Sequence, residues 1–195
     1  EIPLRLVGSE MCIRDRLRQC PYVVCCDGAA NTYIRSGRMP EAIVGDGDSL
    51  LPDIKERYAS LIHSEAEQET NDLSKAFRFC LSQERKRITI MGATGKREDH
   101  TIGNVSLLAD YMEQAEVSMM TDYGIFVPIR EDSMFESYIG QQISVFNMNS
   151  TALSAEGLAY PLSVFTNWWQ GTLNEALARH FIIRTEGKVL VFRVF

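Results

Sequence analysis

The feature that most constrains the fold is a regular alternation of strand-like and helix-like runs between Tyr22 and Met120. Each strand-like run is short and apolar, and a segment with helical spacing or a polar loop follows it. The strand-like runs are 22–26, 41–45, 61–64, 87–92 and 116–120. Alternation of this kind predicts a mostly parallel sheet with helices on its faces.

The intervening segments carry ordinary helix signals. After Asn71, apolar residues recur at the spacing of one helical stripe, and Asn71 or Asp72 is placed to cap the helix. In the last of these segments, we expect Ile102, Val105, Leu108 and Met112 to face inward. The predicted helices are 29–37, 51–61, 72–83 and 100–115.

The pattern of residue types changes after Thr121. Short β-rich pieces are broken by glycine, proline and asparagine, which predicts an antiparallel all-β region. The Glu186–Gly187 pair between two β-rich runs is typical of a hairpin turn. We therefore predict two domains, an α/β domain at 1–125 and an all-β domain at 126–195.

The composition limits the classes of function. The chain has 195 residues, 45% of them hydrophobic and 24% charged, which is typical of soluble globular proteins. A net charge of −6 argues against a nucleic-acid-binding face. The five cysteines form no C-x-x-C pair, so we expect reduced thiols and a cytoplasmic protein rather than a zinc site. No apolar run approaches the roughly 20 residues of a membrane span.

The opening segment, EIPLRLVGSEMCIRDR, has two interpretations. It is either an ordinary first strand and loop, or an artefact of a gene model or read boundary. We assign no function to residues 1–16.

Aspartates follow successive predicted strands, where ligands of open α/β sheets bind. Any one of them can be a turn former or helix cap. The pair in VGDGDSL, Asp46 and Asp48, is harder to explain in that way, because like charges two positions apart repel each other. Hard carboxylate oxygens on one side of an extended segment suit Mg²⁺. The aspartates are Asp27, Asp46, Asp48, Asp72 and Asp99.

The loop ATGKREDH supplies positive charge before a predicted helix. Arg97 could grip a phosphate with two hydrogen bonds, and amides at a helix start attract phosphate. Alone, the loop is better explained as a solvated charged turn, but opposite the acidic aspartates phosphate binding is the favoured interpretation. The Gly95–Lys96 pair lacks the upstream glycine and the following Ser/Thr of a P-loop.

Four motifs together resemble the thiamine pyrophosphokinase family: DGAAN, PEAIVGDGDS, QETNDLSKA and GATGKREDHTIGNVSLL. The match runs from about Tyr22 to the end of the chain. It implies a three-layer α/β domain followed by an antiparallel β-sandwich. It also implies that ATP and thiamine give AMP and thiamine diphosphate with Mg²⁺. A homodimer is implied as well, with thiamine held between one subunit's α/β domain and the other's β domain.

The resemblance also implies roles for individual residues. Asp46, Asp48 and Asp72 would bind the metal, and with Arg97 and Asp99 they form the expected catalytic group. Thr172 and Asn174 would contact thiamine. Lys96 and Leu173 depart from the family pattern, where a glycine and a serine are common. The residues expected to line the ATP and transfer site are Asp27, Gly28, Asn31, Gln68, Thr70, Lys75, Gly92, Arg97, Asp99 and His100.

Two other functions fit part of this pattern. An aspartate-nucleophile phosphatase of the haloacid-dehalogenase type uses D-x-D-x-T/V after a strand, but Leu50 stands in the last place. A nucleotide- or thiamine-binding module without turnover is the non-catalytic alternative. Trp168 and Trp169 are adjacent, so on a strand only one could stack on a ligand; packing in the core or at a dimer interface is the other interpretation.

Overall fold

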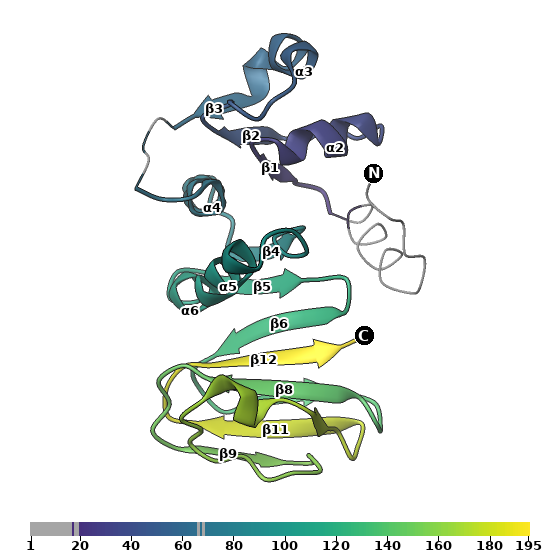
Figure 1. Cartoon of the computed structure of the whole chain (residues 1–195), viewed down its shortest axis with the longest axis vertical. Helices are drawn as coiled ribbons and strands as arrows, with labels where there is room; N and C mark the ends of the chain where they lie inside the picture. The colour runs from purple at the N-terminus through teal and green to yellow at the C-terminus, as the bar shows by residue number, and fades with distance from the viewer. Residues whose placement is uncertain (1–16, 18–19, 66, 68) are drawn as a thin grey trace. The chain divides into compact units, whose positions relative to one another are not determined.

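The structure is a computed structural model that describes residues 17, 20–65, 67 and 69–195 (Figure 1). The expectations for residues 1–16 and for Gln68 lie outside this part of the chain. The described residues form two compact units, one that ends at Lys86 and one that runs from Arg87 to Phe195. Each unit is described by itself.

The unit that ends at Lys86 is built on a parallel sheet of three strands in the order β1-β2-β3. The strands are β1 (Val24–Cys26), β2 (Ala42–Gly45) and β3 (Ile62–Ser64). The helices are α2 (Ala29–Arg35), α3 (Pro52–Arg57), the 3₁₀ turn η1 (Ala59–Leu61) and α4 (Asp72–Ser82).

Both faces of this sheet are covered, which explains why β2 is apolar at every position. Ile43 packs in a cluster with residues of α2 and α3, including Ala30 and Ile54. On the other face, Ala42 and Val44 pack with Ala76 of α4. The side-chain alternation of a strand thus sends consecutive residues into two separate clusters.

The second unit contains two sheets and two short α-helices. A six-stranded sheet has the order β10-β8-β12-β6-β5-β4, and a three-stranded sheet has the order β7-β11-β9. The first group of strands is β4 (Arg87–Met91), β5 (Glu116–Met120), β6 (Gly124–Ile129), β8 (Gln142–Asn147), β10 (Asn174–Glu175) and β12 (Val189–Val194). The other elements are β7 (Ser133–Glu136), β9 (Leu153–Glu156), β11 (His180–Thr185), α5 (Glu98–Ser106), α6 (Leu108–Tyr111) and the 3₁₀ turn η2 (Trp168–Gly171).

A single apolar core joins the two sheets of this unit. Val145 and Val191 of the larger sheet lie in one buried cluster with Phe135 and Phe181 of the smaller one. The rings of Phe135 and Phe181 are stacked, with centroids 5.1 Å apart. Antiparallel sheets that share a core in this way form a β-sandwich. The predicted fold class, an α/β part followed by an antiparallel β-sandwich, is therefore confirmed.

The predicted parallel strands are divided between two sheets. β4 and β5 pair in parallel, but β5 also pairs antiparallel with β6 and so belongs to the six-stranded sheet. The turn between β5 and β6 is closed by Thr121, whose hydroxyl oxygen accepts hydrogen bonds from the N–H groups of Tyr123 and Gly124. The side chain of Thr121 thereby reverses the chain between strands that the sequence alone placed in different domains.

Two local predictions were wrong. The Glu186–Gly187 turn does not join a hairpin, because β11 pairs with β7 and β9 whereas β12 pairs with β6 and β8 (Figure 1). The turn carries the chain from one sheet to the other, and Glu186 bonds through its backbone to Thr151 and Ala152. Ile102 is 59% exposed: the predicted long helix is divided into α5, which has no buried residue, and α6, which buries Leu108.

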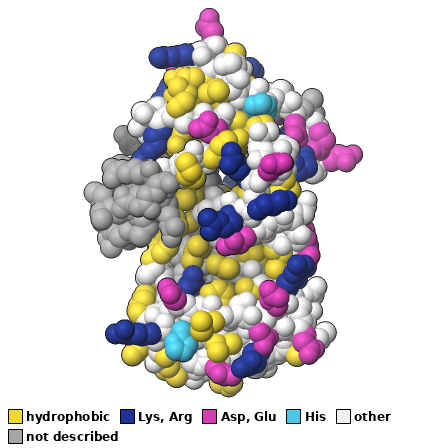
Figure 2. Space-filling view, turned by 180° about the vertical axis from the view of Figure 1, so that it is seen from behind, with side chains coloured by type: hydrophobic (Ala, Val, Ile, Leu, Met, Phe, Trp, Pro, Cys, Tyr) yellow, Lys and Arg dark blue, Asp and Glu magenta, His cyan; other side chains and the backbone are white. Residues whose placement is uncertain are grey.

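The described cysteines are free thiols, and burial raises the pKa of Cys25 and of Cys26 to about 12. On the face drawn in Figure 2, basic and acidic side chains are interspersed rather than gathered by sign. Among the described helices, none has the length and apolar character needed to cross a bilayer.

Candidate functional site

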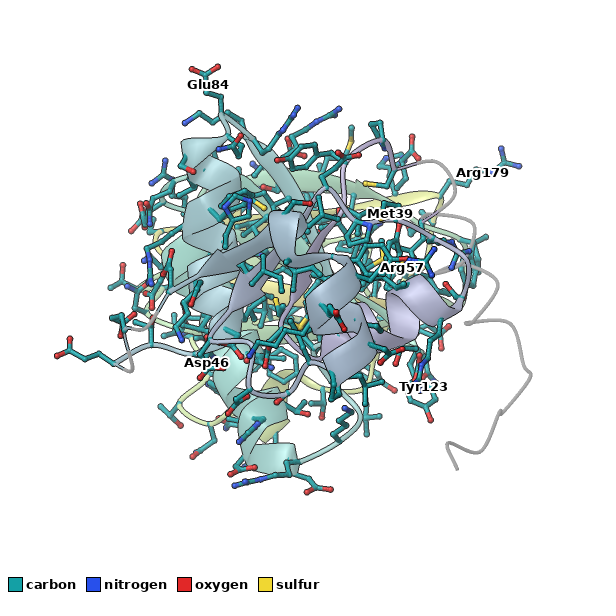
Figure 3. The ribbon with its side chains drawn as sticks, turned by 90° about the horizontal axis from the view of Figure 1, so that it is seen from above. Met39, Asp46, Arg57, Glu84, Tyr123 and Arg179 are labelled. Carbon is teal, nitrogen blue, oxygen red and sulfur yellow. The ribbon has the colours of Figure 1, made fainter. Side chains whose placement is uncertain are left out.

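The site is built around the turn that follows β2, residues 46–51, which we call the aspartate loop. Asp46, labelled in Figure 3, accepts a hydrogen bond on Oδ1 from the N–H of Asp48 at 3.1 Å. Asp48 accepts one on Oδ1 from the hydroxyl of Ser49 at 2.9 Å, and this bond lowers the pKa of Asp48 below its ordinary value. Both carboxyl groups are exposed, so the loop presents two oxygen ligands to a bound ion.

Asp27, at the end of β1, is the buried member of the group. Its residue is only 3% exposed, and its Oδ2 accepts a hydrogen bond from the N–H of Ser49 at 3.0 Å. Its Oδ1 is buried and has no hydrogen-bond partner among the described residues. Burial raises the pKa of Asp27, because desolvation disfavours the charged form.

Gly45 makes room for Asp27. A Cβ at Gly45 would lie 2.7 Å from the Cβ of Asp27, closer than real Cβ contacts. The backbone of Asp27 itself has φ of 33°, a conformation that costs energy for any residue except glycine. The ends of β1 and β2 are thus shaped to hold this carboxyl group beside the aspartate loop.

The three carboxylates converge. One carboxylate oxygen from each of Asp27, Asp46 and Asp48 lies within 4.8 Å of the corresponding oxygen of the other two. Hard oxygen ligands at this spacing suit a divalent cation such as Mg²⁺. The unpartnered oxygen of Asp27 is an independent sign, because buried polar atoms normally have a partner. The residues present therefore fit a bound divalent cation.

Two side chains hold the aspartate loop in place. The amide of Asn31 donates to the carbonyl of Ser49 at 2.8 Å and accepts from the N–H of Leu51 at 3.1 Å. The ammonium of Lys55 donates to the carbonyl of Gly47 at 2.9 Å. Asn31, which the resemblance assigns to the ATP site, is thus committed to the loop that carries the aspartates.

Replacing Asn31 with alanine is expected to weaken the binding of a divalent cation by roughly tenfold, a typical loss when a partner of a metal ligand is removed. The reason is that the loop would lose both bonds that fix Ser49 and Leu51. The measurement is a titration of the purified protein with Mn²⁺, followed by electron paramagnetic resonance. Thr32→Ala, at the exposed next position of α2, is the matched control, and an unchanged Mn²⁺ affinity in Asn31→Ala would contradict the role.

Asp72 and Lys75 form a second charged pair in the same unit. Asn71 caps α4 by accepting from the N–H of Ser74, which leaves Asp72 at the first helical position. Lys75 is only 4% exposed, and its Nζ lies 3.3 Å from Oδ1 of Asp72. Asp72 therefore already has a cationic partner, and the group of three converging carboxylates does not include it.

Thr70, a predicted ATP-site residue that precedes α4, belongs to a polar network. Thr70 donates from its N–H and its hydroxyl to the carboxylate of Glu67, at 2.7 Å each. Arg78 donates to the hydroxyl oxygen of Thr70 and pairs with Glu65 and Glu67. The structure thus brings Thr70 into contact with an arginine that sequence reasoning did not select.

The predicted phosphate-binding residues of the ATGKREDH loop lie in the other unit. Arg97 forms two hydrogen bonds to the carboxylate of Asp99, and this contact lowers the pKa of Asp99. Both side chains are exposed, as are Gly92 and His100. Asn104 anchors the loop from α5 by donating to the carbonyl of Ala93 at 2.9 Å. Arg97 is therefore accessible to an anion, but it is partnered by a neighbouring carboxylate.

The residues predicted to contact thiamine line a cavity of about 330 Å³ in the β-sandwich unit. Asn174 is buried, and its amide bonds to the backbone of Tyr160 on both sides, donating to its carbonyl and accepting from its N–H. The hydroxyl of Thr172 donates to the carbonyl of Trp169. Asn174 thus shapes the cavity wall more than it offers free polar atoms.

The two tryptophans lie on η2 rather than on a strand, and neither belongs to the core. Trp168 packs edge-on against Phe146, with ring centroids 6.0 Å apart, and remains 43% exposed. Trp169 is 73% exposed and Leu173, at the mouth of the cavity, is 79% exposed. The interpretation of core packing was therefore wrong for both tryptophans.

Sequence reasoning missed two members of the site and gave a third a different role. It placed Asp27 with ATP, whereas the structure brings it together with Asp46 and Asp48. Ser49 and Lys55, which hold the aspartate loop, were not selected. Their only signals were the position of Asp27 directly after a strand and of Ser49 next to the aspartate pair.

Two family models match the chain in succession. Thiamin pyrophosphokinase, catalytic domain, matches residues 13–120, and thiamin pyrophosphokinase, substrate-binding domain, matches residues 124–192. The first model covers more than half of the chain. The two matches meet within the turn between β5 and β6.

Curated relatives that are similar to this chain carry the same family name. Thiamine pyrophosphokinase 1 of Oryza sativa subsp. japonica is 30% identical over 139 residues, which is 58% of this chain and 51% of the relative. The thiamine pyrophosphokinase of Bacillus subtilis is 34% identical over 86 residues, 42% of this chain and 40% of the relative. The chain thus spans about half the length of the curated relatives it matches.

Solved structures agree in fold. The thiamine pyrophosphokinase structure from Bacillus subtilis has a TM-score of 0.77 at 21% identity, over 89% of this chain and 87% of that one. The thiamin pyrophosphokinase structure from Candida albicans has a TM-score of 0.75 at 18% identity, over 91% and 82%. Together with the two family models, these matches show that the chain belongs to the thiamin pyrophosphokinase family.

Proposed function

We propose that this protein transfers the diphosphate group of ATP to the hydroxyl of thiamine, giving AMP and thiamine diphosphate. The observation that carries the proposal is the convergence of Asp27, Asp46 and Asp48 at the ends of two parallel strands. This convergence occurs in a chain whose two parts match the catalytic and the substrate-binding models of one kinase family. The relatives themselves carry the name thiamine pyrophosphokinase.

The chemistry sets what the residues must do. The thiamine hydroxyl oxygen bonds to the β-phosphorus of ATP, the bond from that phosphorus to the α,β-bridging oxygen breaks, and AMP leaves with the electron pair. We propose that Asp46 and Asp48 hold Mg²⁺, with Asp72 as the further acidic ligand that the resemblance implies. Bound there, Mg²⁺ would neutralise negative charge on the phosphate oxygens. One aspartate of the same group accepts the proton of the thiamine hydroxyl.

The remaining residues bind and orient the substrates. We assign ATP to Gly28, Gln68, Thr70, Lys75, Gly92, Arg97, Asp99 and His100, with Asn31 acting through the aspartate loop. Thr172 and Asn174, on the 330 Å³ cavity, are assigned to thiamine. Residues 1–125 would act as the nucleotide-binding domain and 126–195 as the thiamine-binding and dimerisation domain.

We also propose a cytoplasmic homodimer. The support is a set of exposed apolar side chains in residues 160–173, a segment that also lines the cavity and that a second subunit could cover. These side chains are Tyr160, Val164, Trp168, Trp169 and Leu173.

The charge of thiamine also fits the proposed function. Thiamine is a cation, so an acidic site such as the aspartate loop would attract it.

The test is to incubate the purified protein with Mg²⁺, ATP and thiamine and to follow AMP. We expect AMP only when thiamine is present, with one thiamine diphosphate formed for each AMP. Omission of thiamine and addition of EDTA are the two controls.

Two other results would reject the proposal. Release of inorganic phosphate without thiamine would indicate a phosphatase of the aspartate-nucleophile type. Binding of ATP or thiamine without any AMP would indicate a binding module that lacks turnover.

A further inference from the structure

We propose that Asp27 is a direct ligand of the divalent cation, the third carboxylate beside Asp46 and Asp48. The inference rests on the proposed function for the presence of a metal, and it changes the role that the resemblance gives Asp27 from nucleotide contact to metal ligand. It also predicts that the protein binds the metal before any nucleotide arrives.

The first argument is the state of the two carboxylate oxygens of Asp27. Oδ2 is held by the N–H of Ser49 at 3.0 Å, so the orientation of the group is fixed. Oδ1 is left buried without a partner among the described residues, and such an atom is costly unless something satisfies it. Only 3% of the surface of Asp27 is exposed, so bulk water is a poor substitute for a hydrogen-bond partner or a metal ion at Oδ1.

The second argument is the chemistry of the neighbours. One oxygen each of Asp46 and Asp48 lies within 4.8 Å of an oxygen of Asp27. Ionised carboxylates accept hydrogen bonds but donate none. No described lysine or arginine forms an ion pair with any of the three. Lys55, a cation on the neighbouring helix α3, donates to the carbonyl of Gly47 instead. A divalent cation would satisfy all three carboxylates together.

The third argument is the unfavourable backbone conformation and the close packing that hold this carboxyl group in place. Asp27 has φ of 33°, and position 45 must be glycine because a Cβ there would lie 2.7 Å from that of Asp27. A positive φ alone is compatible with an aspartate in a turn, but the close approach of Gly45 to this side chain is not required by a turn. Strained conformations of this kind persist where a site requires them.

Asp72 provides the contrast. Its Oδ1 lies 3.3 Å from the buried ammonium of Lys75, so its charge is balanced without a metal. We therefore expect metal binding in the absence of nucleotide to depend more on Asp27 than on Asp72.

The experiment measures Mn²⁺ binding without nucleotide, with free Mn²⁺ followed by electron paramagnetic resonance. Asp27→Asn is expected to weaken Mn²⁺ affinity by at least about tenfold, because loss of even an indirect partner of a ligand has that effect. Asp53→Asn, the same change at an exposed residue of α3 in the same unit, is the control and should bind as the wild type does. Circular dichroism establishes that each variant is folded.

A second variant distinguishes direct ligation of the metal by residue 27 from a purely structural role of that residue. Asp27→Cys replaces a hard oxygen with a sulfur, which should raise the affinity for Zn²⁺ relative to Mn²⁺ compared with wild type. A change of metal preference requires contact with the ion, whereas a merely structural role would leave the preference unchanged.

The inference is overturned if folded Asp27→Asn binds Mn²⁺ within about twofold of the wild type, or if the wild type binds no Mn²⁺ without nucleotide. An unchanged Zn²⁺ to Mn²⁺ preference in folded Asp27→Cys would also overturn it. Failure of the proposed function is a different result, because it is read from thiamine-dependent AMP formation by the wild type. A wild type that binds Mn²⁺ through Asp27 but forms no AMP would retain the site and lose the reaction.

Discussion

Asp46→Asn is expected to lower the rate of thiamine-dependent AMP formation by about 10²–10³-fold, a typical loss when one electrostatic contact to the reacting phosphates is removed. This corresponds to about 3–4 kcal/mol of transition-state stabilisation. Asparagine keeps the Oδ1 acceptor that receives the N–H of Asp48 at 3.1 Å, so the aspartate loop should keep its conformation. What the variant loses is the negative charge.

The rate should be measured at saturating ATP and thiamine over a range of Mg²⁺ concentrations. Because the lost charge weakens metal binding first, high Mg²⁺ is expected to restore part of the activity. Asp53→Asn should retain the wild-type rate, since Asp53 is exposed on α3 and contacts no part of the aspartate loop in the hydrogen bonds described. Unchanged turnover in Asp46→Asn would show that the metal role assigned to Asp46 is wrong.

Gly171→Ala is expected to destabilise the β-sandwich unit by about 3 kcal/mol, at the upper end of the usual cost of overpacking. A Cβ at Gly171 would lie 1.7 Å from the carbonyl oxygen of Val145 and 3.2 Å from the ring of Phe165. The carbonyl belongs to β8, which lies between two neighbours in the six-stranded sheet and cannot retreat. The 3₁₀ turn η2 must therefore move, and the cavity wall moves with it.

Thermal unfolding provides the measurement, with an expected fall in Tm of roughly 6–12 °C. The KM for thiamine should rise in the same variant, because Gly171 lines the cavity assigned to thiamine. Gly103→Ala is the matched control: nothing lies within 4 Å of a Cβ there, and alanine favours the helix α5. A Tm for Gly171→Ala close to that of the wild type would contradict the close packing of η2 on β8.

The sequence allowed the local elements to be predicted well. The apolar stripe after Asn71 predicted α4 and its cap, and the short apolar runs predicted the strands, because these signals depend on residues a few positions apart. The convergence of Asp46 and Asp48 followed from their position after a buried strand. Such features are local and survive the change from sequence to structure.

Long-range pairing could not be predicted in the same way. The role of Asp27 depends on the register of β1 with β2, which sets Cys26 beside Val44 and Asp27 next to Gly45. The error at Glu186–Gly187 has the same origin, because the turn signal does not show which partner each strand will choose. In both cases, contacts between residues far apart in the sequence decide the outcome.

The turn at Thr121 has a consequence for how the protein can be taken apart. It lies where the two family models meet, so residues 120 and 124 look like natural ends for expressing the two halves separately. Yet β5 and β6 are hydrogen-bonded neighbours, and cleavage between them would expose two unpaired strand edges, which promote aggregation. The compact units divide instead at Lys86–Arg87. The segment that carries β4 and β5 thus matches the catalytic-domain model but belongs to the same compact unit as the β-sandwich, so we expect the two to unfold together.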